Sequence, residues 1–172
     1  MILVTGAAGH IGNVLVRELL SDGKKVRALI LPGEDISSLE GLDTEVTEGN
    51  VLDPISLNKA MKGIDIVFHL AGVISIMPGD NEMMQKVNVE GTKNVLKAAK
   101  ENGISRFVYT SSIHALSRSW IGKIDETVPF DPDNLAGGYD RTKAAASLAV
   151  LEAAKNGLDA VIVWPNRCDR SA

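Results

Sequence analysis

The amino-acid sequence predicts an α/β fold in which a doubly wound parallel sheet carries helices on both faces. Short apolar runs alternate with amphipathic stretches along the chain. Strands separated by helices pair in parallel through right-handed crossovers. The central runs are strongly apolar, which is typical of strands that are covered on both faces. Glycines at 6, 9 and 12 mark the turn between the first run and the first helical pattern.

The expected elements follow one another in a regular alternation. We expect strands at 2–5, 25–31, 44–48, 64–70, 106–110 and 160–163. We expect helices at 10–22, 55–62, 82–101 and 139–155, which are ended by Gly23, Gly63, Gly103 and Gly157. A polar stretch, 117–138, precedes the last helix. Ligands of such sheets bind beyond the carboxyl ends of the strands, so the residues at those ends are the candidates for a site.

Length, composition and charge narrow the class of protein. With 172 residues, 45% of them hydrophobic, the chain can bury one core, and we expect one domain. A net charge of −4 without a basic run argues against nucleic acid or an anionic membrane as a partner. The single cysteine, Cys168, excludes an internal disulfide and fits a reducing compartment. No apolar run approaches a membrane span of roughly 20 residues, and no basic leader precedes the first strand. We therefore expect a soluble, cytoplasmic protein, and we assign no residue to a metal.

The glycines form a Gly-x-x-Gly-x-x-Gly triplet between a strand and a helix. Such a turn points free backbone N–H groups and the positive end of the helix dipole at a bound anion, typically a pyrophosphate. Gly6 allows the turn, Gly9 lets a phosphate approach the backbone, and Gly12 lets helix and strand pack closely. The alternative is a turn whose glycines serve only the fold.

Tyr139 and Lys143 are four residues apart at the start of a helical pattern, so they share one face. A phenol has a pKa of about 10, and a nearby ammonium favours its ionised form, which makes this pair a candidate general acid and base. Ser112 follows the strand at 106–110 and could hydrogen-bond a substrate oxygen at the same sheet edge. The alternatives are an ordinary surface helix for the pair and a helix cap or turn for Ser112.

Several motifs occur together in one order. They are the glycine triplet, Leu70-Ala71-Gly72, Asn88 within Val-Asn-Val-Glu-Gly-Thr-Lys-Asn, Tyr-Thr-Ser-Ser112 and Tyr139-x-x-x-Lys143. With them the chain resembles the extended short-chain dehydrogenase/reductases, the NAD-dependent epimerase/dehydratase family, whose cofactor domain is a Rossmann fold. Within that family it looks most like dihydroflavonol reductases and hydroxysteroid dehydrogenases.

The resemblance implies a role for each matching position. Tyr139 is the proton donor and acceptor, Lys143 holds the nicotinamide ribose and lowers the pKa of the tyrosine, and Ser112 polarises the substrate oxygen. The implied contacts of NAD or NADP are Gly6, Gly9, His10, Ile11, Gly12, Leu31, Asn50, Val51, Leu70, Ala71, Gly72, Asn88, Thr110, Tyr139, Lys143 and Pro165.

Some of these positions have other interpretations. Asn50 stands where the family has an Asp beside the adenine, and its amide oxygen can still accept a hydrogen bond. Asn88 either supports the site from the long helix or is a buried residue that ties two strands together. His10 is interpreted as a packing or surface residue, His69 as a core histidine with satisfied hydrogen bonds, and His114 as a residue that could touch substrate.

The resemblance implies an oxidoreductase that moves a hydride between nicotinamide and a ketone or secondary alcohol. A nucleotide-sugar epimerase or dehydratase is the alternative enzyme, and a cofactor-binding fragment or sensor without turnover is the alternative of another class. The choice between NAD and NADP stays open, because Leu31 stands where an acid or an arginine would decide it. Glu34 and Asp35 come late for the acid, and Arg27 comes early for the arginine.

Family members continue well past the strand at 160–163 into a substrate-binding part. We therefore expect residues 1–172 to be the NAD(P)-binding domain, without the substrate-binding C-terminal part. Members of the family commonly dimerise through two helices. Those helices correspond here to 82–101 and 139–155, so a homodimer that binds a small carbonyl or alcohol substrate is expected.

Overall fold

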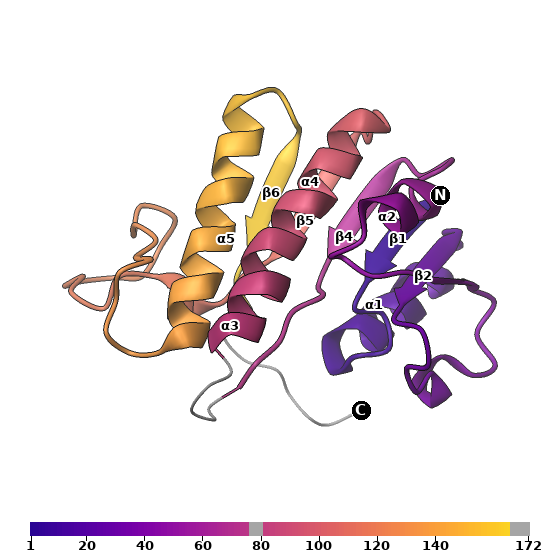
Figure 1. The fold of residues 1–172 in the computed structure, drawn as a ribbon, viewed down its shortest axis with the longest axis horizontal. Coiled ribbons are helices and arrows are strands. Elements are labelled where there is room, and N and C mark those ends of the chain that lie inside the picture. Colours follow the sequence, from indigo (N-terminus) through magenta and orange to yellow (C-terminus); the bar gives the residue numbers. More distant parts are fainter. Residues whose placement is uncertain (76–80, 166–172) are drawn as a thin grey trace.

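The computed structural model describes residues 1–75 and 81–165 and contains one parallel sheet (Figure 1). Its strand order is β3-β2-β1-β4-β5-β6, and each neighbouring pair is parallel. The strands are β1 (Ile2–Thr5), β2 (Val26–Ile30), β3 (Glu45–Glu48), β4 (Ile66–His69), β5 (Arg106–Thr110) and β6 (Ala160–Val163). The predicted doubly wound fold is confirmed, with boundaries that differ from the expected ones by no more than a few residues.

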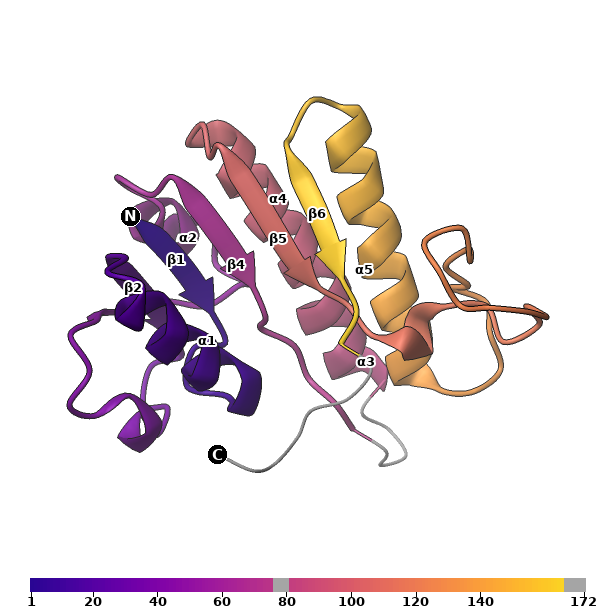
Figure 2. The ribbon, with the colours of Figure 1, turned by 180° about the vertical axis from the view of Figure 1, so that it is seen from behind.

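Helices cover both faces of the sheet. One face packs against α1 (His10–Ser21), which lies over β1 and β2 (Figure 2). The other face packs against the helices α2 (Pro54–Ala60), α4 (Thr92–Glu101) and α5 (Gly138–Lys155) (Figure 1). Short 3₁₀ turns, η1 (Ser37–Leu39) and η3 (Ile113–Ala115), follow β2 and β5.

Each face of the sheet has its own hydrophobic core. On the first face Val16 of α1 packs with buried residues of β1 and β2 such as Val4 and Ala28. On the second face the buried side chains of α2, α4 and α5 meet those of the strands; the largest clustered members are Leu3, Leu57, Met61, Phe107 and Tyr109. Burial on both faces explains why the sequence shows continuous apolar runs.

The strand order fixes where a ligand can bind. The chain leaves β1 toward β2 on one side, and β4 returns on the other side of β1, so the direction of winding reverses between β1 and β4. Ligands of open α/β sheets bind at this switch point, beyond the carboxyl ends of the strands. The glycine loop after β1 and the segment after β4 therefore lie side by side.

The helix expected at 82–101 is built of three parts. It begins as α3 (Asn81–Met84), continues as the π-helix η2 (Gln85–Gly91) and ends as α4. A π-helix is rare and concentrates at functional positions, because it gives up regular hydrogen bonds to re-aim side chains. The expected long helix is therefore present, and the buried Asn88 lies in its π segment, which the sequence did not indicate.

Among the described residues no helix has both the length and the apolar character to cross a membrane. Cys168 lies outside the described residues.

Candidate active site

The glycine loop after β1 is built for close backbone contacts. Gly6 has a φ of +68°, and a Cβ on it would lie 2.8 Å from the backbone nitrogen of Ala71. A Cβ on Gly12 would lie 2.0 Å from the carbonyl oxygen of Gly6, so α1 begins in contact with the turn. The N-cap, Gly9, supplies no side-chain hydrogen bond, and the first turn of α1 contains no acidic residue. The first amides of α1 are therefore left for an anion.

A cavity of about 490 Å³ lies beside this loop, at the carboxyl ends of β1, β2, β3 and β4. It is lined by eight of the predicted cofactor contacts, namely Gly6, Gly9, Leu31, Asn50, Val51, Leu70, Ala71 and Gly72. Its further lining, which the sequence analysis missed, consists of Thr5, Leu29, Ile30, Glu34, Gly49, Leu52, Val73, Met83 and Val87. Four of them, Thr5, Leu29, Ile30 and Gly49, lie at the same strand ends, so extending each motif along its strand would have found these four.

Lys143 lies in the second turn of α5 with its ammonium group buried. Its Nζ donates hydrogen bonds to the carbonyl oxygen of Thr110 at 2.7 Å and to the hydroxyl of Tyr109 at 3.2 Å. The same atom lies 4.7 Å from the centre of the Tyr109 ring, as in a cation–π contact. Burial lowers the pKa of Lys143 to about 8. An ammonium has three N–H donors, and two of them are used here.

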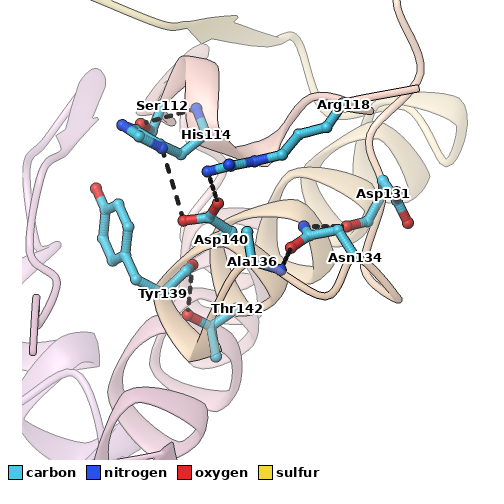
Figure 3. Close-up of polar contacts among 9 residues, drawn as sticks. All are labelled: Ser112, His114, Arg118, Asp131, Asn134, Ala136, Tyr139, Asp140 and Thr142. Carbon is cyan, nitrogen blue, oxygen red and sulfur yellow. Dashed lines mark hydrogen bonds and ion pairs between the residues drawn. The ribbon is translucent and has the colours of Figure 1, made fainter. Parts of the chain in front are cut away.

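Tyr139 lies in the first turn of α5, and its phenol points toward the side where Ser112 and His114 lie (Figure 3). Burial raises the pKa of Tyr139, the interaction with the Ser112 hydroxyl lowers it, and the charge of Asp140 raises it again. The ammonium of Lys143 donates to the carbonyl oxygen of Thr110. The expectation that Lys143 lowers the pKa of Tyr139 stays a prediction.

Ser112 has the capping role that its position suggested, and its contact with a substrate oxygen stays a prediction. It lies two residues beyond β5 and is the N-cap of η3, where its hydroxyl accepts a hydrogen bond from the backbone N–H of His114 at 3.2 Å. The same hydroxyl affects the pKa of the Tyr139 phenol. The cap therefore fixes Ser112 beside the tyrosine.

A charged cluster holds the segment after β5 against the start of α5. The buried carboxylate of Asp140 accepts a hydrogen bond from Nη2 of Arg118 at 2.8 Å and lies 3.7 Å from Nδ1 of His114 (Figure 3). The ring of His114 lies edge-on to that of Tyr139, with centroids 6.4 Å apart. His114 is thereby held next to the phenol, and its side chain is 53% exposed on the ligand side of the sheet.

Asn88 connects the loop after β4 to α5. Its Oδ1 accepts a hydrogen bond from the Val73 N–H at 2.7 Å, and its Nδ2 donates to the Val73 carbonyl and the Thr142 hydroxyl. A Cβ on Gly72 would lie 3.2 Å from this Oδ1 and 3.8 Å from Nζ of Lys143. Asn88 therefore ties the loop after β4 to α5 and does not join two strands, as one interpretation of the sequence had it.

The chain matches the 3-beta hydroxysteroid dehydrogenase/isomerase family over residues 3–161. It belongs to this family. It is 39% identical over 163 residues to sterol demethylase protein B of Methylococcus capsulatus, with 95% of this chain and 50% of that protein covered. It is 37% identical over 173 residues to a 3 beta-hydroxysteroid dehydrogenase/Delta 5→4-isomerase of Mycobacterium tuberculosis, with 94% and 44% covered.

A solved structure with bound NAD has the same fold as this chain. It is a short-chain dehydrogenase/reductase superfamily protein of Agrobacterium tumefaciens, 32% identical, with a TM-score of 0.82. The match covers 95% of this chain and 48% of that one. The chain spans about half the length of the relatives it matches. The resemblance to extended short-chain dehydrogenases and hydroxysteroid dehydrogenases is confirmed.

The other predicted contacts are not among the residues that line the cavity. His10 and Ile11 are exposed at the start of α1, and Pro165 is exposed at the end of the described chain. Thr110 contributes the carbonyl that holds Lys143. Asn50 lines the cavity, but its Oδ1 already accepts a hydrogen bond from the N–H of Leu52 at 2.9 Å.

Proposed function

We propose that residues 1–172 form the cofactor-binding half of an NAD(P)-dependent oxidoreductase that acts on a ketone or secondary alcohol. The observation that carries the proposal is the meeting of three groups at one sheet edge. Ser112 lies beside the phenol of Tyr139, and the buried ammonium of Lys143 is anchored to Thr110 one helical turn away. The cavity and the glycine loop lie along the same edge.

The residues present fit a dinucleotide. The uncapped first turn of α1 suits a pyrophosphate, and the absence of a Cβ on Gly12 lets α1 begin in contact with the glycine turn. The largely apolar cavity between Leu31 and Val51 suits an adenosine. When bound, the nicotinamide supplies or takes the hydride, and this chemistry belongs to the cofactor.

The side chains of the site supply the proton and the orientation. The phenol of Tyr139 keeps its proton at neutral pH, because burial raises its pKa, so it is set to give a proton to a substrate oxygen. The Ser112 hydroxyl donates a hydrogen bond to the same oxygen. Lys143, charged below about pH 8, offers its remaining N–H to a ribose hydroxyl and compensates the charge that develops on Tyr139.

The experiment is a titration of the chain with NADH, followed by the change in nicotinamide fluorescence. Tyr139→Phe is expected to keep the affinity, since it removes only the proton. Lys143→Met is expected to weaken it about tenfold, a loss of about 1.4 kcal/mol for one charge-assisted hydrogen bond. No binding by the unsubstituted chain would refute the proposal.

Turnover with secondary alcohols and NAD, including a 3β-hydroxysteroid, distinguishes the enzyme classes. Release of NADH during turnover supports an oxidoreductase. Conversion of a nucleotide sugar without release of NADH would indicate an epimerase or dehydratase. Binding of NADH without any turnover would indicate a cofactor-binding fragment. Dimerisation through α4 and α5 and a cytoplasmic location stay predictions.

A further inference from the structure

We propose that this site selects NAD over NADP, and that Glu34 is the residue that makes the selection. The inference rests on the proposed function, because it concerns the adenosine end of the same cofactor site. It addresses the choice between NAD and NADP, which the sequence left open because Leu31 is neither an acid nor an arginine.

A tight turn brings Glu34 back to the end of β2. Leu31 to Glu34 form a β-turn with Pro32 and Gly33 in the middle, and Gly33 has a φ of +76°. The N–H of Glu34 donates to the carbonyl of Leu31 at 3.0 Å, which closes the turn. Proline followed by a glycine with positive φ is the pairing that a type II turn requires. The backbone therefore turns back on itself, and Glu34 lies close to Leu31.

The side chain of Glu34 points back along the same turn. Its Oε2 accepts a hydrogen bond from the backbone N–H of Leu31 at 2.8 Å. The carboxylate thus lies at the first residue after β2, where an acid of a dinucleotide-binding fold meets the ribose 2′-hydroxyl. Both Leu31 and Glu34 line the cavity.

In the described part of the chain, no basic side chain lines the cavity beside this carboxylate. Glu34 is the one charged residue among the described residues that line it. Arg27 is turned to the opposite end of the sheet, where its guanidinium binds Glu45 at 2.8 Å and the carbonyls of Ala60 and Lys62. Arg17 donates to the carbonyl of Ser38 at 2.8 Å and does not line the cavity.

The chemistry of the two cofactors differs at this position alone. The ribose of NAD carries a 2′-hydroxyl, which can donate a hydrogen bond to a carboxylate that already accepts one. NADP carries a phosphate there, which brings negative charge next to Glu34 with no described cation to receive it. We therefore expect NADH to bind at least tenfold more tightly than NADPH.

The test is a pair of titrations, NADH and NADPH against the chain, read by nicotinamide fluorescence. Glu34→Gln keeps an oxygen for the Leu31 N–H but removes the charge, and is expected to reduce the ratio of the two dissociation constants at least fivefold. Glu48→Gln is the matched control. It removes the same charge from an exposed residue at the end of β3 that does not line the cavity, and should leave the ratio within twofold.

Each outcome separates the two proposals. Equal binding, or tighter binding of NADPH, overturns the selection for NAD and leaves the proposed function standing. A preference for NADH that Glu34→Gln does not change overturns the role of Glu34. Binding of neither cofactor overturns the proposed function together with this inference.

Discussion

His69 is expected to make this fold sensitive to acid. The side chain is fully buried in β4, where its Nδ1 lies 2.7 Å from the hydroxyl of Thr5 and its Nε2 lies 3.0 Å from the hydroxyl of Thr92. Burial, and secondarily the charge of Lys143, lower the pKa of His69 to about 3. The interpretation of His69 as a core histidine with satisfied hydrogen bonds is confirmed.

The sign and size of the effect follow from proton binding. In the unfolded chain a histidine binds its proton near pH 6.5, whereas folded His69 binds it near pH 3. Between these values the unfolded state holds more protons, so the free energy of unfolding falls as the pH falls through this window, by about 1.4 kcal/mol per pH unit. At pH 4.5 the expected loss is about 3 kcal/mol, a large part of a typical stability of about 5–15 kcal/mol.

The assay is urea unfolding at several pH values between 7 and 4.5. His69→Gln removes the titrating group but keeps hydrogen-bonding atoms, so its stability should fall less steeply with acid than that of the unsubstituted chain, by about 3 kcal/mol over the range. His10→Gln, at an exposed position on α1, is the control and should follow the unsubstituted chain. Parallel curves for His69→Gln and the unsubstituted chain would refute the reasoning.

Three further predictions concern the site. Gly12→Ala should lower NADH affinity more than tenfold, because its Cβ would lie 2.0 Å from the Gly6 carbonyl, whereas Gly23→Ala, which meets no atom within 4 Å, should leave the affinity unchanged in the same titration. NADH affinity should fall as the pH rises through about 8, where Lys143 loses its charge, and a flat profile would contradict the assigned role. Arg118→Met should destabilise the chain by about 1–3 kcal/mol in urea unfolding by leaving the Asp140 carboxylate unpaired, and adding Asp140→Asn should recover part of that loss.

The fold could be predicted from the sequence because its signals are local. Apolar runs such as Ile2–Thr5 and the glycines that end the helices depend on neighbouring residues, and the strand–helix alternation allows few topologies. The glycine loop was predicted for the same reason. The π segment Gln85–Gly91 could not be, since its irregularity comes from what Asn88 contacts far along the chain, at Val73 and Thr142.

The site was predicted less completely, for two physical reasons. By residue count, Glu34 lies too far past the end of β2 to meet the ribose, because the count assumes an extended backbone. In the structure, Pro32 and Gly33 fold the chain back toward Leu31. The pairing of Tyr139 and Lys143 was deduced from helical spacing, but spacing does not show where a long side chain ends. In the structure the ammonium of Lys143 donates to the Thr110 carbonyl and to the Tyr109 hydroxyl, two contacts that helical spacing could not reveal.

A line of buried polar groups connects the glycine loop to the catalytic side of the sheet. The Thr5 hydroxyl accepts a hydrogen bond from the Ala71 N–H and meets His69, which meets Thr92, whose hydroxyl donates to the carbonyl of Asn88. Asn88 in turn reaches Thr142 on α5. If the Thr5 hydroxyl donates to Nδ1 of His69, then Nε2–H donates to Thr92, and each member is satisfied in one direction.

This line of hydrogen bonds stabilises the fold and also holds segments of the site in place. Among the described residues no buried side-chain nitrogen or oxygen lacks a hydrogen-bond partner, so moving any member would leave a buried group unpaired at a cost of about 1–3 kcal/mol. The end of β1, the loop after β4 and the start of α5 are therefore held in one arrangement, since each contributes a member to the line. His69 is the neutral member in the middle of this line. Its burial makes the fold sensitive to acid, and its hydrogen bonds to Thr5 and Thr92 help to hold the line in place.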